Sequence, residues 1–123
     1  MTGTTAPRED GVPAAAVLGR LGVRPADADL TVVQFSSAFC GPCRVTKARL
    51  AQLRATRPGL AVVQVDAESH LQEVRDLDVR VTPTLLFLDR SGAVVRRSAG
   101  APHPGELSAF VDAHVGGRIG GVS

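Results

Sequence analysis

The stretch Leu30-Thr-Val-Val-Gln-Phe-Ser-Ser-Ala-Phe-Cys40-Gly-Pro-Cys43 decides the fold, because it joins an apolar run to a close pair of cysteines. Residues 30–35 are largely β-branched and apolar, which is typical of a central strand buried on both faces. From about Cys40 to Thr56 the residues are mostly good helix formers, and Arg57-Pro58-Gly59 ends the run. The sequence therefore predicts a core strand followed by a helix whose first turn holds both cysteines.

The spacing of the two cysteines gives them different chemical roles. Two intervening residues, Gly41 and Pro42, bring the sulfurs within bonding reach, and Pro42 lacks an N–H that the first helical turn cannot pair. Cys40 lies where unpaired N–H groups and the helix dipole stabilise an anion, so we expect a lowered pKa and a reactive thiolate. Cys43 lies one turn further in, and we expect it to be more buried and to stay protonated until it acts as the resolving thiol.

The rest of the chain alternates between helices and strands. We expect helices over residues 13–22 and 71–77 and from Pro104 to about 115, and strands over 60–65, 84–88 and 93–97. For the helix over residues 71–77, a capping box is predicted at Ser69 and Gln72, and an apolar stripe at Leu71, Val74 and Leu77. No convincing strand precedes the first helix.

The order of these elements predicts an α/β fold with one mixed sheet and helices on both of its faces. Two strand–helix–strand crossovers predict that the first three strands are parallel, and the final hairpin adds one antiparallel strand. We expect a single domain over residues 13–115. The Thr-, Pro- and Gly-rich start, residues 1–12, and the Gly-rich end, residues 116–123, are predicted to be flexible tails.

Composition favours a small globular protein and excludes several functional classes. Of the 123 residues 44% are hydrophobic, and the net charge is only +2, with the basic side chains scattered along the chain. No basic stripe with stacking aromatics indicates nucleic-acid binding, and no run approaches the ~18 apolar residues of a membrane span. The polar start lacks the apolar segment of a secretory signal. We therefore expect a monomer in the cytoplasm that binds neither nucleic acid nor membrane.

A close cysteine pair in a reducing compartment is typical of redox catalysis or of metal binding rather than of a structural disulfide. Structural zinc needs four ligands, and Cys40 and Cys43 supply two; His70, His103 and His114 are not at ligand spacing. We therefore predict no bound metal and no cofactor, with a metal shared between two chains as the alternative. His103 is expected to be an exposed loop or helix-cap residue, with tuning of the thiolate or partner contact as the alternative.

Several motifs resemble those of the thioredoxin family. Phe39-Cys-Gly-Pro-Cys-Arg44 looks like its active site, and Val81-Thr-Pro-Thr84 stands where that family carries its cis-proline. Gly92 matches the hairpin glycine, and Gly100-Ala101 resembles the loop into the last helix. The resemblance covers roughly residues 28–115. It implies the thioredoxin fold, disulfide exchange with proteins, and regeneration by a thioredoxin-reductase-type electron donor.

The same resemblance implies a substrate-binding surface around the cysteines, formed by Phe39, Thr82, Pro83, Gly100 and Ala101. For Pro83 there is also a physical reason. Only an X–Pro bond adopts cis at low cost, and a cis bond there would expose backbone groups of Thr82 to an extended substrate peptide. The alternative is that Pro83 merely begins a strand, where proline is tolerated.

Three departures from the family pattern qualify the functional prediction. The family usually has Trp at the position of Phe39, a buried Asp at that of Gln34, and a Lys partner at that of Val62. Losing both members of a buried charged pair is physically consistent, because losing one would leave an unpaired charge in the core. An amide cannot act as a base at neutral pH, so we expect slower disulfide reduction than in an ordinary thioredoxin.

The predicted function is therefore that of a thiol–disulfide oxidoreductase, acting as a protein-disulfide reductase through Cys40 and Cys43. A thioredoxin-fold binding module with weak or no redox activity is the main alternative. An oxidase or isomerase is a third possibility, disfavoured because the Gly-Pro pair between the cysteines looks like the reducing branch of the family.

Overall fold

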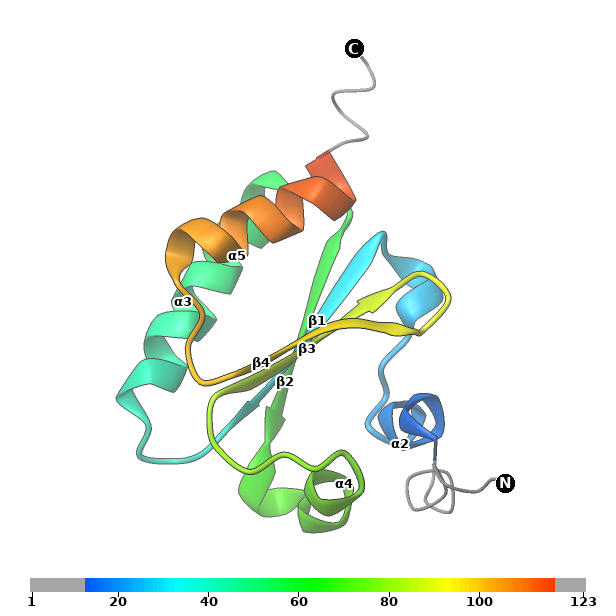
Figure 1. Cartoon of the computed structure of the whole chain (residues 1–123), viewed down its shortest axis with the longest axis vertical. Coiled ribbons are helices and arrows are strands. Elements are labelled where there is room, and N and C mark those ends of the chain that lie inside the picture. The colour runs from blue at the N-terminus through cyan, green and yellow to red at the C-terminus, as the bar shows by residue number, and fades with distance from the viewer. Residues whose placement is uncertain (1–12, 117–123) are drawn as a thin grey trace, which may run out of the picture.

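A four-stranded sheet lies between two layers of helices, as Figure 1 shows for the computed structural model. The structure describes residues 13–116. The strands are β1 (Leu30–Ser36), β2 (Leu60–Asp66), β3 (Thr84–Asp89) and β4 (Val94–Ala99), and the helices are α2 (Ala14–Arg20), α3 (Gly41–Thr56), α4 (Leu71–Asp76) and α5 (Pro104–Val111). Short 3₁₀ turns η1 (Pro25–Asp27) and η2 (Ala67–Ser69) and a π-helical segment η3 (Asp112–Gly116) complete it. Every predicted helix and strand is found with small shifts at its ends.

The strand order is β2-β1-β3-β4, which places β1 in the middle of the sheet. β2 is parallel to β1, but β3 is antiparallel to it, with Phe35 opposite Thr84. The prediction that the first three strands are parallel is therefore wrong. α4 has six residues and is about 9 Å long, too short to return along the roughly 23 Å of a seven-residue strand. β3 consequently begins at the end of the sheet where β1 and β2 finish.

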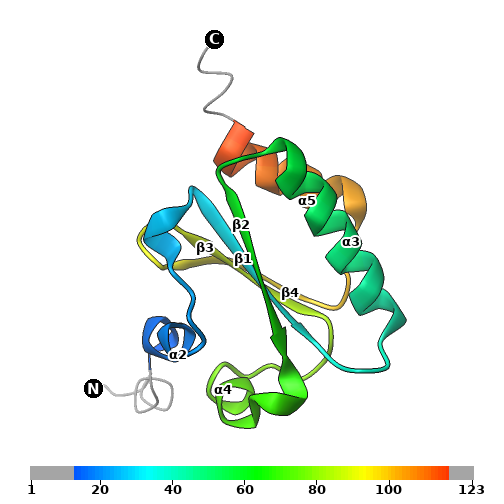
Figure 2. The ribbon, with the colours of Figure 1, turned by 180° about the vertical axis from the view of Figure 1, so that it is seen from behind.

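Each face of the sheet has its own hydrophobic core. Residues of α2 and α4 pack on one face, where Val33 and Phe35 of β1 are buried. Residues of α3 and α5 pack on the other, over Leu30 and Val32. Figure 2 shows the two helical layers on opposite sides of the sheet. Because both of its faces are covered, β1 is buried along almost its whole length, as its apolar sequence predicts.

Two local predictions around α4 are wrong. Leu71 is 57% exposed instead of lying in the apolar stripe. Ser69 and Gln72 form no capping box, because the Ser69 hydroxyl donates to Asp66 and the Gln72 amide donates to Asp76. Asp66 instead caps η2 by accepting from the N–H of Glu68. The Ser69 hydroxyl, predicted to cap the helix over residues 71–77, is thus part of the η2 turn.

The first helix of the described region is α2. Within residues 13–116 no strand precedes β1, and no helix is long and apolar enough to cross a membrane. The predicted domain, residues 13–115, falls inside the described region. Residues 1–12 and 117–123 of the predicted flexible tails, 1–12 and 116–123, lie outside it, whereas Gly116 is the last residue of η3.

Candidate active site

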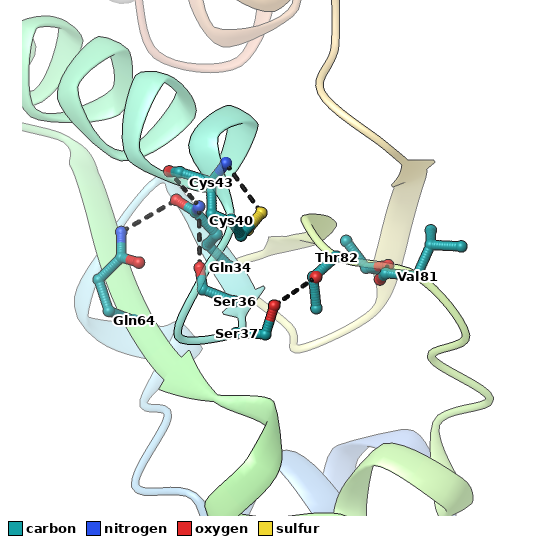
Figure 3. The surroundings of a disulfide bond; sticks show 9 residues. Gln34, Ser36, Ser37, Cys40, Cys43, Gln64, Val81 and Thr82 are labelled. Carbon is teal, nitrogen blue, oxygen red and sulfur yellow. Dashed lines mark hydrogen bonds between the residues drawn. A yellow bond between two sulfur atoms is a disulfide. The ribbon is translucent and has the colours of Figure 1, made fainter.

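The two cysteines form a disulfide at the start of α3 (Figure 3). Their Cα atoms are 5.2 Å apart, and their exposed fractions are 8% for Cys40 and 3% for Cys43. Cys40 is the N-cap residue, and its Sγ accepts a hydrogen bond of 3.1 Å from the backbone N–H of Cys43. This N–H is one of the donors that a helix leaves unpaired, so a sulfur anion at Cys40 would be stabilised there.

A buried amide lies directly beneath the second cysteine. Gln34 has no exposed surface, and its Nε2 donates to the carbonyl of Cys43 at 2.9 Å and to the hydroxyl of Ser36 at 3.1 Å. Its Oε1 accepts from Nε2 of Gln64 at 3.1 Å, as Figure 3 shows. All the polar atoms of this side chain are therefore engaged without any charge.

Gln64 is the residue of this network that sequence reasoning missed. The family pattern drew attention to Val62, but the parallel register pairs Gln34 with Gln64 and Val32 with Val62. Val62 lies on the same face of the sheet, two residues away, and packs against the core. The second glutamine in the apolar run of β2 was the available signal, and only the strand register shows that it meets the first.

The loop before β3 is tied to the segment that precedes the cysteines. The Thr82–Pro83 peptide bond is cis, as predicted. The hydroxyls of Ser37 and Thr82 are 2.9 Å apart and share a hydrogen bond that sequence reasoning did not foresee. Gly100 donates its N–H to the carbonyl of Pro83 at 2.8 Å, so the loop after β4 lies beside the cis-proline. The φ angle of Gly100 is +91°, a value that residues with side chains rarely adopt.

The predicted contact residues differ in their exposure. Phe39 is fully exposed next to Cys40, and Ala101 is also exposed. Thr82 is half-buried, whereas Pro83 is buried. Val81, which was not among the predicted contact residues, is 48% exposed. The site therefore presents apolar side chains to solvent on three segments around the disulfide: Phe39 before α3, Val81 before β3 and Ala101 after β4.

A pocket of about 380 Å³ opens on the β2 side of the disulfide. Both cysteines line it together with Ser36, Ser37, Gln64 and Asp66 and with the basic residues Arg44 and Lys47 of α3. The pKa of Asp66 is lowered by hydrogen bonds from the Ser69 hydroxyl and the Glu68 N–H, so its carboxylate is ionised at neutral pH. The pocket thus has charges of both signs within reach of the redox pair.

The histidines stand apart from this chemistry. His103 is an exposed helix-cap residue, as expected, because its Nδ1 accepts from the N–H of Gly105 at the start of α5. The ring nitrogens of His70 and His114 contact the carbonyls of Asp66 and Phe110. Within the described part of the chain, no three His, Cys, Asp or Glu residues are grouped as metal ligands.

A disulfide of CxxC type at a helix N-terminus, with a cis-proline loop tied to the same end of a mixed sheet, defines the class of thioredoxin-fold redox proteins. A family model described as Thioredoxin matches residues 23–113. The chain therefore belongs to the thioredoxin family.

Individual relatives agree with this assignment. The chain is 33% identical to thioredoxin H4-1 of Oryza sativa over 63% of its own length and 59% of the relative's. It is 30% identical to thioredoxin H-type 2 of Nicotiana tabacum, over 72% of the chain and 74% of the relative. The solved structure of Fasciola hepatica thioredoxin has 28% identity and a TM-score of 0.68, covering 81% of this chain and 93% of that one.

Some of the curated relatives are longer than the matching part of this chain. The mitochondrial thioredoxin of Mus musculus matches at 31% identity over 69% of this chain but only 51% of its own length. The chain thus spans about half to two-thirds of several relatives that it matches.

Proposed function

We propose that the protein reduces disulfides in other proteins through a reversible Cys40–Cys43 dithiol. The observation that carries this proposal is the N-cap position of Cys40, with the Cys43 N–H donating to its sulfur. In the reduced protein that N–H and the α3 dipole favour the thiolate of Cys40, which is the attacking species. Cys43 is the more buried of the two and supplies the resolving thiol.

The reaction then proceeds in two exchanges. The Cys40 thiolate attacks one sulfur of a substrate disulfide, and the other substrate sulfur leaves as a thiolate. The Cys43 thiol loses its proton and attacks Cys40, which releases the second substrate thiolate and forms the Cys40–Cys43 disulfide. Two electrons pass from the protein to the substrate. A thioredoxin-reductase-type donor returns the two electrons, with no bound cofactor or metal in this chain.

The substrate is a protein segment held across the loops that flank the disulfide. Phe39 and Ala101 offer exposed apolar contact, while Thr82, Pro83 and Gly100 form the connected backbone beside it. We propose a monomeric protein of the cytoplasm that contacts neither nucleic acid nor membrane. Some of its relatives carry the word mitochondrial in their names, so the compartment needs a direct localisation experiment.

The proposal is tested by reduction of insulin in the presence of dithiothreitol, followed as precipitation of the released chains. The wild type should accelerate the reaction, and Cys40→Ser should abolish the acceleration. In a separate reaction without dithiothreitol, reduced Cys43→Ser should accumulate a mixed disulfide with the substrate. A wild type without activity would indicate the alternative function of a binding module. The reduction potential, measured in defined dithiothreitol buffers, separates a reductant from an oxidant or isomerase.

A further inference from the structure

The pocket beside the disulfide has the size and the lining of a small-molecule site. Its volume of about 380 Å³ falls in the range of about 300–1,000 Å³ that is usual for such sites. Both cysteines line it, so a bound molecule has the redox-active sulfurs in reach. The Ser36 and Ser37 side chains and the Gln64 amide add hydrogen-bonding groups to its walls.

Two basic residues that line the pocket have no ion-pair partner among residues 13–116. Arg44 and Lys47 lie one turn apart on α3, are exposed, and make no salt bridge within residues 13–116. α3 contains no acidic residue that could neutralise them. These cations are therefore available to an anionic group that enters from solvent.

The lining of the pocket also includes one negative charge, at Asp66. The carboxylate of Asp66 accepts hydrogen bonds of 3.0 Å from the Glu68 N–H and 2.8 Å from the Ser69 hydroxyl, which hold it in place. These contacts lower its pKa, and it stays ionised over the physiological range. The pocket consequently has two positive charges and one negative charge around a disulfide.

We propose that this pocket binds a small thiol of amino-acid or peptide type, or the disulfide of such a thiol. A molecule with two carboxylates and one ammonium group matches the pocket, because the carboxylates pair with Arg44 and Lys47 and the ammonium group pairs with Asp66. The proposal rests on the redox function proposed above and extends it from protein disulfides to a low-molecular-weight couple.

The exchange balances without any further reactant. A small thiolate attacks Cys40 of the oxidised protein, and Cys43 leaves as a thiolate that takes up a proton. A second small thiolate attacks the mixed disulfide, forms the small disulfide and releases Cys40. The protein gains two electrons and two thiol groups are converted to one disulfide. In the opposite direction the reduced protein reduces the small disulfide by the same steps.

Charge selectivity tests the pocket. The probes are oxidised glutathione, which has more carboxylates than ammonium groups and is net anionic, cystamine, which is cationic, and bis(hydroxyethyl) disulfide, which is neutral. The rate of oxidation of the reduced protein is measured by timed alkylation and mass spectrometry, because the chain has no Trp or Tyr to report the reaction by fluorescence. Dividing each rate by that of the neutral probe removes any change in Cys40 reactivity itself.

Arg44→Gln and Lys47→Gln should each lower the relative rate of oxidised glutathione about two- to fivefold, the range expected for one exposed ion pair. Both should raise the relative rate of cystamine. The effect should disappear at about 1 M NaCl, where the Debye length is about 3 Å. Arg54→Gln is the matched control, because Arg54 is an exposed cation of α3 outside this pocket.

Relative rates that stay unchanged in the two pocket variants, or that fall equally in Arg54→Gln, would overturn the proposal. Insulin reduction by the same preparations separates failure of the pocket proposal from failure of the proposed reductase function. A wild type that reduces insulin but shows no charge selectivity contradicts the pocket alone. A wild type that does not reduce insulin contradicts the proposed function.

Discussion

Replacing Gln34 by Asp tests how the proton of the resolving cysteine is removed. Gln34 lies beneath Cys43 and is fully buried, so a carboxylate there would be the nearest buried base. A positioned general base typically contributes about 10²–10⁴-fold to a rate. We expect Gln34→Asp to speed the resolving step at least about tenfold. Gln34→Asn is the matched control, since it has the size of Asp and no basic group.

Both variants should lower stability. Each shortens the side chain by about 1.5 Å, one carbon–carbon bond, which breaks hydrogen bonds that are now 2.9 and 3.1 Å long. An unsatisfied buried polar group costs about 1–3 kcal/mol and a lost buried methylene about 0.8 kcal/mol. We expect urea unfolding to show a loss of about 2–4 kcal/mol for Gln34→Asn.

The Asp variant should also acquire a pH dependence of stability. Burial raises the pKa of a carboxyl in the folded state above its unfolded value of about 3.9. The folded state then holds the proton more tightly, so the Asp variant should match the Asn variant below about pH 4. It should become less stable than the Asn variant as the pH rises through the folded pKa.

The resolving step is measured by stopped-flow mixing of the reduced protein with dithiobis(nitrobenzoate), whose released thiolate is coloured. The first phase, attack by Cys40, depends on reagent concentration. The second phase, release by Cys43, does not. The second phase should be faster in Gln34→Asp than in Gln34→Asn, with similar first phases. Equal second phases in the two variants across the pH range would refute the role assigned to the missing carboxylate.

Three further predictions concern stability and use urea unfolding followed by circular dichroism. Thr31 is buried, and its hydroxyl makes no hydrogen bond within residues 13–116, so Thr31→Val should stabilise the protein by about 1–3 kcal/mol, and a loss of stability would contradict this. Gly100→Ala should cost about 1 kcal/mol because φ is +91°, whereas Gly19→Ala in α2, where the added methyl meets nothing within 4 Å, should stabilise by about 0.5–1 kcal/mol. Hydrogen bonds from the Ser91 hydroxyl and from backbone N–H groups lower the pKa of Asp89. Its contribution to stability is present above the unfolded pKa of about 3.9 and is lost as the pH falls through the folded pKa. Asp89→Ala should therefore lose less stability than the wild type on acidification, and an equal loss would contradict this.

The sequence could predict those features that depend on residues close together in the chain. The apolar run of β1 and the helix-forming run after it place Cys40 at a helix N-cap, and the structure has it there. Gly22 follows the first helix with φ +82°, as a glycine past a helix end should. The cis bond before Pro83 was predictable because the family resemblance supplied the context that a single X–Pro pair lacks.

Features that depend on how distant segments meet were not predictable. The direction of β3 depends on where α4 lies at the end of the sheet, and hydrophobic periodicity carries no information about that. The contact between Gln34 and Gln64 depends on the register of two apolar strands. The apolar pattern of these strands is compatible with several registers, so the sequence does not specify which residues face each other. Leu71 is exposed because the short α4 buries Val74 and Leu77 against the core and leaves its first turn outside.

Gln34 and Gln64 do more than replace the buried base of the family pattern, because they also form the polar contacts beneath Cys43. Within residues 13–116 no acidic side chain is fully buried, so no buried carboxylate beneath the disulfide is available to accept the proton of Cys43. Gln34 instead links β1 to the first turn of α3 through the Cys43 carbonyl, and Gln64 fixes the orientation of that amide. Cys43 also lines the solvent-open pocket, which gives its proton a route to water. The neutral amide network therefore holds Cys43 in place without supplying a base. We predict that water in the pocket accepts the proton of Cys43 and that this transfer is slower than transfer to a buried carboxylate.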